Sequence, residues 1–158
     1  MASLVDLSGN WSRAIGKAFV AFGAIEHITV VCMRAIPKDP LQRSTRRFTL
    51  SQRIDLLLEI LESHPGESSE ELAGHLSTAR SLAETRNLIA HNPLVFDFYR
   101  HTDGSLSSRE VIAHLHTERR LSLEQAQEFA QAAEDLATNL YRVSYAFIAA
   151  LGAQRSSA

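Results

Sequence analysis

Residues 84–104 read ETRNLIAHNPLVFDFYRHTDG and contain the point at which the expected secondary structure changes. Pro93 has no backbone N–H and disfavours the helical conformation in the residue before it, so a helix arriving from the N-terminal side must stop there. Apolar and polar residues then alternate over residues 94–100, which predicts a strand, and Asp103-Gly104 is a turn signal. The stretch therefore predicts a helix that leads directly into a β-hairpin.

The second strand of this hairpin is expected over residues 106–116. Pairing the strands about a two-residue turn would give the hairpin one mainly apolar face and one polar face, because successive side chains of a strand point to opposite faces. The apolar face would carry Leu94, Phe96 and Phe98 opposite Ala113, Val111 and Arg109, and the polar face would carry Asp97, Tyr99, His114 and His116.

The rest of the chain has the apolar spacing of amphipathic helices, with few prolines or glycines to interrupt it. We therefore expect a single all-α domain over residues 1–158, an up-and-down four-helix bundle with a small β-hairpin inserted at about residues 94–117, before the last helix. Capping boxes, which mark helix starts, are expected at Thr49 with Gln52, Ser68 with Glu71, and Ser122 with Gln125. The expected helices cover residues 11–36, 49–62, 68–92 and 123–151.

The composition is that of one ordinary soluble globular domain, with 158 residues, of which 45% are hydrophobic and 22% are charged. The formal net charge is -2, so the chain has no overall positive field to hold nucleic acid, and an RNA contact would need a local basic patch. The N-terminal residues lack the pattern of a signal peptide, and no uninterrupted apolar run approaches the ~20 residues that span a bilayer. We therefore expect no membrane association.

Cys32 is the only cysteine, so the chain cannot form an internal disulfide and has too few thiols for a zinc finger or an iron–sulfur cluster. Its place on the apolar stripe of the first helix favours a small buried hydrophobe over a nucleophile. The sequence also lacks a glycine-rich phosphate loop, a serine nucleophile elbow and a His-Glu-x-x-His zinc motif. The expectation is a cytoplasmic protein without a cofactor or a bound metal.

Arg86 interrupts the apolar stripe of the helix that ends at Pro93. Steps of seven residues from Leu72 lead through Ala79 to Arg86, which places the guanidinium on the core-facing side, where a charge must be paired. Glu26, at the edge of the apolar stripe of the first helix, is the candidate partner. One interpretation of Arg86 is therefore an internal ion pair that fixes the register of the bundle.

His91 lies five residues beyond Arg86, about 140° round an ideal helix, and shares with Asn87 a face that points away from the core. The negative end of the helix dipole favours the charged imidazole at this position. A histidine can move a proton near neutral pH, and an arginine can neutralise a phosphate. The group of residues is therefore suited to chemistry on a phosphate ester.

In outline, these side chains suffice for metal-free cleavage of RNA by its own 2′-hydroxyl. His91 would act as general base or acid, Arg86 would stabilise charge on the phosphorane, and Asn87 would orient the phosphate or the imidazole. Because a single histidine is a single proton carrier, two copies of the chain meeting at a dimer cleft would complete the site.

The segment Arg86-Asn87-x-x-x-His91 resembles the signature of the HEPN superfamily, helical-bundle proteins whose motif is Arg, four to six residues, then His, commonly with a polar residue directly after the Arg. Arg109 and His114 have the same separation, but they fall on the expected hairpin, whereas the first motif closes a long helix. The resemblance implies a homodimer with both motifs at a shared cleft, and often a metal-independent endoribonuclease of toxin–antitoxin, phage-defence or RNA-processing systems. It also implies an antitoxin or other regulatory protein as a further partner.

Some members of that superfamily have lost activity, and a second interpretation follows from them. The chain would then be a catalytically inactive dimeric module that binds RNA or protein, in which Arg86 and Glu26 hold the bundle together and His91 caps the helix end.

A third interpretation is a metal-dependent hydrolase built around His114 and His116, since a His-x-His pair on a strand is half of a feasible metal site. Asp97 and Glu118 could add ligands, but their spacing does not require it, and solvent exposure of both histidines is the simpler interpretation.

Arg43, Arg46 and Arg47 form a basic connector between the first two helices. Their side chains could follow an RNA backbone, because phosphate contacts require little beyond a cation. A solvated loop accounts for the same charges.

Overall fold

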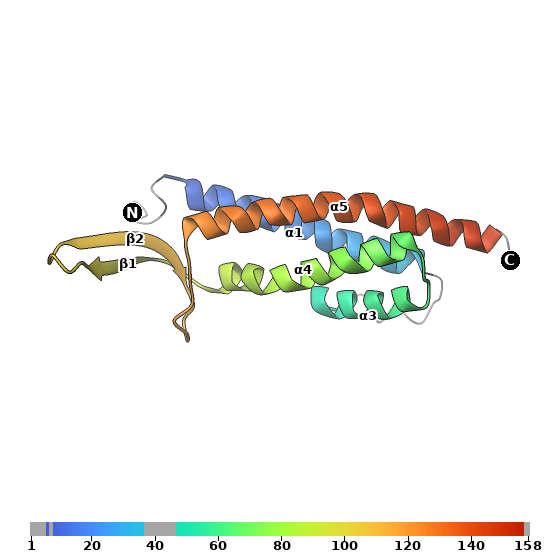
Figure 1. The fold of residues 1–158 in the computed structure, drawn as a ribbon, viewed down its shortest axis with the longest axis horizontal. Helices are drawn as coiled ribbons and strands as arrows, with labels where there is room; N and C mark the ends of the chain where they lie inside the picture. Colours follow the sequence, from blue (N-terminus) through green and yellow to red (C-terminus); the bar gives the residue numbers. More distant parts are fainter. Residues whose placement is uncertain (1–5, 7, 37–46, 157–158) are drawn as a thin grey trace.

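The computed structural model describes residue 6 and residues 8–36 and 47–156. The expected helical bundle with a hairpin before the last helix is confirmed, and the hairpin projects beyond one end of the bundle (Figure 1). The helices are α1 (Asn10–Ala35), α3 (Leu50–Glu62), α4 (Glu67–His91) and α5 (Leu123–Ser156), and the strands are β1 (Leu94–Arg100), β2 (Leu106–Ala113) and β3 (Arg120–Leu121).

The helices do not alternate strictly in direction, which corrects the expected up-and-down arrangement. α1, α3 and α5 run one way and α4 runs the other way (Figure 1). The first halves of α1 and α5 accordingly share one cluster of buried side chains, in which the rings of Phe22 and Phe129 are 5.6 Å apart, and their second halves share another. The short connection over residues 63–66 makes α3 antiparallel to α4. Since α4 is also antiparallel to α1, α3 runs in the same direction as α1.

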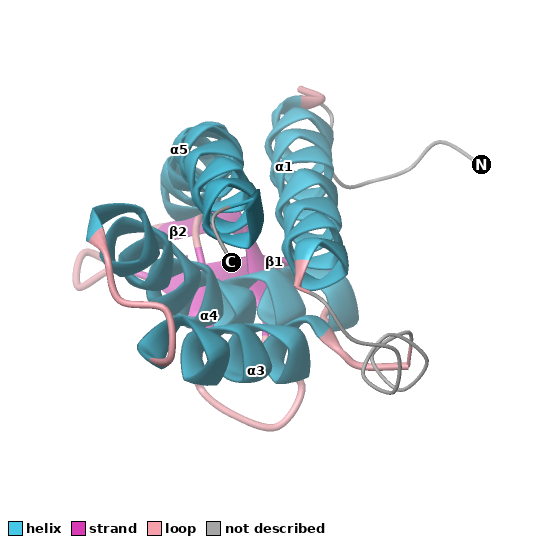
Figure 2. Ribbon diagram, turned by 90° about the vertical axis from the view of Figure 1, so that its right-hand side faces the viewer, coloured by secondary structure: helices cyan, strands magenta, loops and turns pink. Residues whose placement is uncertain are grey.

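The core consists of two clusters of buried side chains, one toward each end of the bundle. The cluster near the hairpin includes Trp11 and Phe22 of α1 and Phe129 of α5, together with the end of α4 and the sheet. The other cluster joins α3 to the end of α1, the start of α4 and the second half of α5. Figure 2 looks along the helices and shows α1 and α5 side by side, with α3 on the opposite side of the bundle. Leu50 and Leu82 pack against both clusters and mark their junction.

Two of the three expected capping boxes are confirmed. The boxes that begin at Thr49 and Ser122 each have their reciprocal pair of hydrogen bonds. The box expected at Ser68 is wrong, because α4 already begins at Glu67 and its first turn is preceded by Gly66 without a side-chain cap. The Gly66 carbonyl instead accepts the first two hydrogen bonds of the helix.

The register of the hairpin is one residue away from the expected one. Residues 101–105 form the loop, whose ends are joined by a hydrogen bond from His101 N to Ser105 O at 2.9 Å. A slip of one residue exchanges the face of β2 that accompanies each face of β1. Phe98, expected on an apolar face, lies opposite Ser108 and is 73% exposed. The observed partners are Leu94 with Ile112, Phe96 with Glu110 and Phe98 with Ser108, in place of Ala113, Val111 and Arg109.

The second strand is also shorter than expected. β2 ends at Ala113, and His114 and His116 lie in the turn that leads to β3. β3 adds a third strand to the sheet, with Ile112 opposite Leu121. The two histidines therefore do not share a strand face.

α1 is long and apolar enough to cross a membrane by length and composition. In the structure its buried side chains contribute to both core clusters. Glu26, in the middle of α1, forms ion pairs with arginines of α3 and α4. The expected absence of a membrane association stays a prediction.

Candidate functional site

Arg86 projects from α4 toward the middle of α1. Its Nη2 lies 3.8 Å from Oε1 of Glu26, the partner expected from the sequence, and its guanidinium carbon lies 5.4 Å from the centroid of the Phe19 ring. The side chain is 30% exposed, so the ion pair is at the edge of the core and is partly screened by solvent. The spacing argument that put this charge on the core-facing side is therefore correct.

The guanidinium of Arg86 has more hydrogen-bond donors than the described residues accept. A guanidinium has five N–H groups. The recorded hydrogen bond runs from Nη1 to Oδ1 of Asn87 at 3.2 Å, and the Glu26 oxygen is too far for a hydrogen bond. Nε is buried and has no acceptor in the described part of the chain. A buried donor without an acceptor costs about 1–3 kcal/mol.

Arg53 of α3 is a member of the site that the sequence analysis missed. Its Nε donates to Oγ1 of Thr29 at 3.1 Å, and its Nη1 donates to the carbonyl oxygen of Phe48 at 2.6 Å. Its Nη2 lies 3.7 Å from Oε2 of Glu26, and the side chain is only 12% exposed. Glu26 is thus shared between two arginines that come from different helices. In the sequence, Arg53 is only a charged residue directly before the apolar Ile54. A solvent-exposed arginine would give the same pattern, so the sequence did not distinguish Arg53 as a site residue.

A pocket of about 430 Å³ lies between α1, α3 and α4 at this point. Two guanidinium groups and one carboxylate line it, which gives the pocket a formal charge of +1. The start of α3 forms one wall, and the positive end of that helix dipole therefore points into the pocket. The lining residues are Glu26, Phe48, Thr49, Leu50, Ser51, Arg53, Ala83, Arg86 and Asn87.

His91 is the last residue of α4 and is exposed, one helical turn beyond Asn87. It makes no hydrogen bond or ion pair within the described ranges, and it does not line the pocket. The structure therefore brings Arg86 and Asn87 together and leaves His91 outside the pocket, farther along the same helix.

The next residue, Asn92, fixes the end of α4. Its Nδ2 donates to the carbonyl oxygen of Leu88 at 2.8 Å, and its Oδ1 accepts from the backbone N of Leu115 at 3.0 Å. The Asn92 side chain thus connects the turn after β2 to the last turn of α4. His91 therefore lies at a helix end that Asn92 fixes to the preceding turn of α4 and to the turn after β2.

The two histidines of the third interpretation lie in that turn. His114 Nδ1 accepts from the backbone N of His116 at 3.1 Å, and the ring centroids are 6.1 Å apart. Asp97 instead accepts from the Tyr99 hydroxyl at 2.8 Å and pairs with Arg120. No group of three or more potential metal ligands occurs among the described residues.

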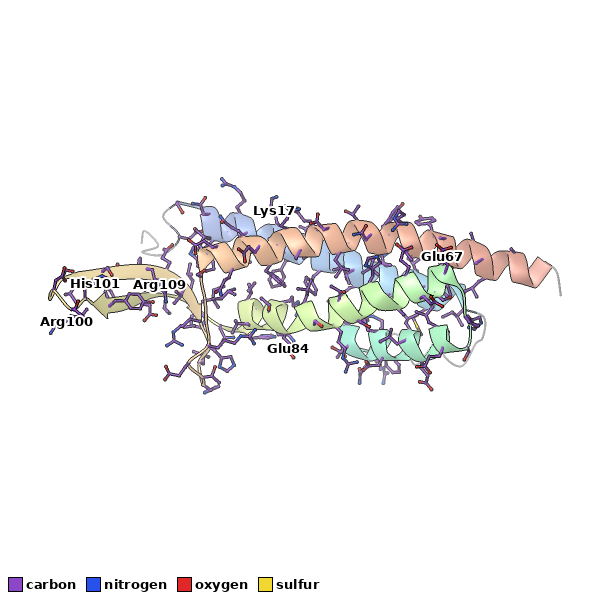
Figure 3. All side chains as sticks on the ribbon, viewed as in Figure 1. Lys17, Glu67, Glu84, Arg100, His101 and Arg109 are labelled. Carbon is purple, nitrogen blue, oxygen red and sulfur yellow. The ribbon has the colours of Figure 1, made fainter. Side chains whose placement is uncertain are left out.

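The other arginines named from the sequence lie away from Arg86, or outside the described residues. Arg109 stands on the projecting hairpin, beyond the helices (Figure 3), and its guanidinium carbon lies 4.6 Å from the centroid of the Tyr99 ring. Arg47 is exposed just before α3. Arg43 and Arg46 lie outside the described residues.

Cys32 is fully buried in the cluster at the α3 end of the bundle. Burial disfavours the thiolate and raises the pKa of this thiol to about 11. The interpretation as a small buried hydrophobe rather than a nucleophile is therefore supported.

Comparisons with protein-family models, with curated proteins and with solved structures found no match. Function is therefore inferred from the residues themselves.

Proposed function

We propose that the protein is a metal-independent endoribonuclease that acts as a homodimer, with Arg86, Asn87 and His91 as its catalytic residues. The observation that carries this proposal is the Arg86 guanidinium, which borders a pocket while its buried Nε–H has no acceptor among the described residues. Asn87 lies directly beside it, and His91 follows one turn later on the same helix. The resemblance of this segment to the HEPN superfamily supports the proposal.

The proposed reaction uses the 2′-hydroxyl of the RNA as the nucleophile. His91 removes the proton, the 2′-oxygen forms a bond to the adjacent phosphorus, and the bond from phosphorus to the 5′-oxygen of the next nucleotide breaks. A second proton carrier protonates the departing oxygen, which leaves a 2′,3′-cyclic phosphate and a 5′-hydroxyl. Arg86 stabilises the negative charge that grows on the phosphoryl oxygens, and Asn87 orients the phosphate or the imidazole.

A homodimer supplies the second proton carrier. His91 lies on an exposed surface at a helix end, so a symmetric contact can bring it opposite the partner subunit's His91. The proposed setting is the cytoplasm, in a toxin–antitoxin, defence or RNA-processing system, with an antitoxin or other regulatory protein as a further partner.

The second candidate function is an inactive dimeric module that binds RNA or protein. The contacts of Arg86 with Glu26 and Phe19 favour it, because they would hold α4 against α1 even without any chemistry. In this case the ion pair is structural, and His91 has no catalytic role.

The deciding experiment incubates the purified protein with a mixed-sequence RNA in excess EDTA. His91→Ala is compared with His75→Ala, a control that removes a histidine from the first half of the same helix. Products are analysed for a 2′,3′-cyclic phosphate. The proposal predicts cleavage by the unchanged protein and by His75→Ala, and none by His91→Ala.

Cleavage of equal rate by His91→Ala would contradict the assigned role of His91. A folded protein that cleaves none of several RNAs, with or without EDTA, would favour the inactive module. Cleavage that occurs without EDTA and is abolished by EDTA would favour the metal-dependent interpretation.

A further inference from the structure

We propose that the pocket between α1, α3 and α4 binds a backbone phosphate of single-stranded RNA, next to the phosphate that is cleaved, and that Arg53 and the start of α3 are its binding groups. This inference rests on the proposed function and adds a binding subsite to it. The groups that it adds to the site come from α3, which contributes none of the catalytic residues proposed above.

Two guanidinium groups are arranged around one carboxylate in the pocket. Both arginine-to-Glu26 distances, 3.7 and 3.8 Å, exceed hydrogen-bond length, so the carboxylate neutralises charge without saturating the donors. Arg53 is held rigidly by Thr29 and Phe48, and its Nη2 faces the shared carboxylate. The pocket therefore holds preorganised cationic donors and an excess of one positive charge, which matches the single negative charge of a phosphodiester.

The backbone at the start of α3 adds N–H donors to the pocket wall. The capping box satisfies the N–H groups of Thr49 and Gln52. The N–H groups of Leu50 and Ser51, both in the pocket wall, have no acceptor among the described residues. Free amides at a helix N-terminus bind anions, and here they belong to residues that line the same pocket as the two arginines.

The pocket has the size and the lining for more than a phosphate group alone. A volume of about 430 Å³ exceeds what one phosphate group fills and is in the range of small-molecule sites. Phe48, Leu50 and Ala83 provide apolar surface for the ribose or base attached to the phosphate. A recess among three helices admits a flexible strand more readily than a stiff duplex, so the expected ligand is single-stranded.

The position of the pocket relates it to the motif. Arg86 and Asn87 belong to the pocket wall, and His91 lies outside it, one turn farther along α4. A strand whose phosphate occupies the pocket would therefore continue along α4 toward His91. The pocket would set the register of the RNA, and Arg86 would stand between the bound phosphate and the one that reacts.

The test measures the binding of a fluorescent ten-nucleotide 2′-O-methyl RNA, which has no free 2′-hydroxyl and cannot be cleaved by the proposed route. Ser51→Glu puts a carboxylate in the pocket wall, in the first turn of α3, where the helix dipole tolerates it. Gln52→Glu is the matched control, because it adds the same charge one residue later, outside the pocket lining, and keeps a capping-box acceptor. Fluorescence anisotropy at two salt concentrations gives the affinity of each variant.

We expect Ser51→Glu to weaken binding at least about tenfold relative to Gln52→Glu, with a smaller dependence on salt. Arg53→Lys, which keeps the charge but loses the planar fork, should weaken binding while the chain stays folded. Equal affinities of Ser51→Glu and Gln52→Glu would overturn the proposal. So would saturation of the pocket by inorganic phosphate without any effect on the affinity for the oligonucleotide.

The two proposals fail in different ways. Because the oligonucleotide cannot be cleaved, its binding reports on the pocket even if the protein has no ribonuclease activity. Binding that depends on Ser51 in a protein that cleaves no RNA would contradict the enzyme and leave the subsite standing. Cleavage of RNA with no effect of Ser51→Glu on binding would support the enzyme and contradict the subsite.

Discussion

Arg86 carries a charge at a position where the helical spacing places core residues, and its surroundings explain why the chain tolerates it. The stem packs toward the core, Phe19 lies near its guanidinium, and Glu26 offsets the charge. The sequence predicted this pair because both residues interrupt or border a regular apolar stripe. It did not predict Arg53, because the contact of Arg53 with Glu26 depends on the direction of α3, which no local pattern encodes.

Substitution of Arg86 separates its structural and catalytic roles. Arg86→Lys keeps the positive charge near Glu26, so the free energy of unfolding should change by less than about 1 kcal/mol, since the pair is partly exposed. A lysine cannot reproduce the guanidinium fork, so cleavage in EDTA should fall about 100-fold or more. Urea unfolding and the RNA assay measure the two effects on the same preparation.

Arg86→Ala is the companion variant, and it should lose activity with a stability loss of about 1–3 kcal/mol. Full activity in Arg86→Lys with unfolding in Arg86→Ala would assign a structural role alone.

Cys32 predicts a pH dependence of stability. Its pKa is raised by burial from 9.0 to about 11, so between these values the unfolded chain has lost a proton that the folded chain retains. The thiol therefore contributes its full stability below pH 9 and less as the pH rises toward 11. In urea unfolding across this range, Cys32→Ala should show a shallower decline than the unchanged protein. Parallel declines would contradict the assignment.

At the scale of the elements, the helices and two of their caps follow from local spacing, whereas the hairpin register does not. Asp103-Gly104 predicts a two-residue turn, but the loop extends from His101 to Ser105 and shifts the pairing by one residue. Local propensity marks where a turn occurs, and the closing hydrogen bond decides how long it is. The starts of both strands are therefore predicted correctly, whereas the end of the second strand and the pairing between the two are not.

Gly104 is required by the observed loop. Its φ of +84° is disfavoured for residues with a side chain, so Gly104→Ala should lower the free energy of unfolding by about 1 kcal/mol. Gly74→Ala is the control, because Gly74 lies in α4 with open space around it and should instead gain about 0.5–1 kcal/mol of helix stability. Urea unfolding of both variants gives the comparison, and effects of the same sign would contradict the loop geometry.

At the scale of the whole molecule, the proposed chemistry requires two copies of the chain. The net charge of -2 provides no general attraction for RNA, so binding must come from local groups such as the pocket arginines. The bundle could be predicted from the sequence because its apolar stripes are regular. The parallel course of α1 and α3 could not, because it depends on how α4 packs against both.

The oligomeric state is directly measurable. Light scattering at micromolar concentration should give twice the chain mass of 17.5 kDa for the unchanged protein, for His91→Ala and for Arg86→Lys. A monomer mass for the unchanged protein would remove the source of the second proton carrier and contradict the proposed mechanism.

The shared direction of α1 and α5 has a practical consequence. The start of α1 lies at the hairpin end of the bundle and the end of α5 lies at the far end (Figure 1). A surface tether or a bulky reporter fused after α5 would therefore stand away from the hairpin and the end of α4, whereas one placed before α1 would crowd them. Immobilisation through the C-terminal side leaves that end of the molecule open to the solution.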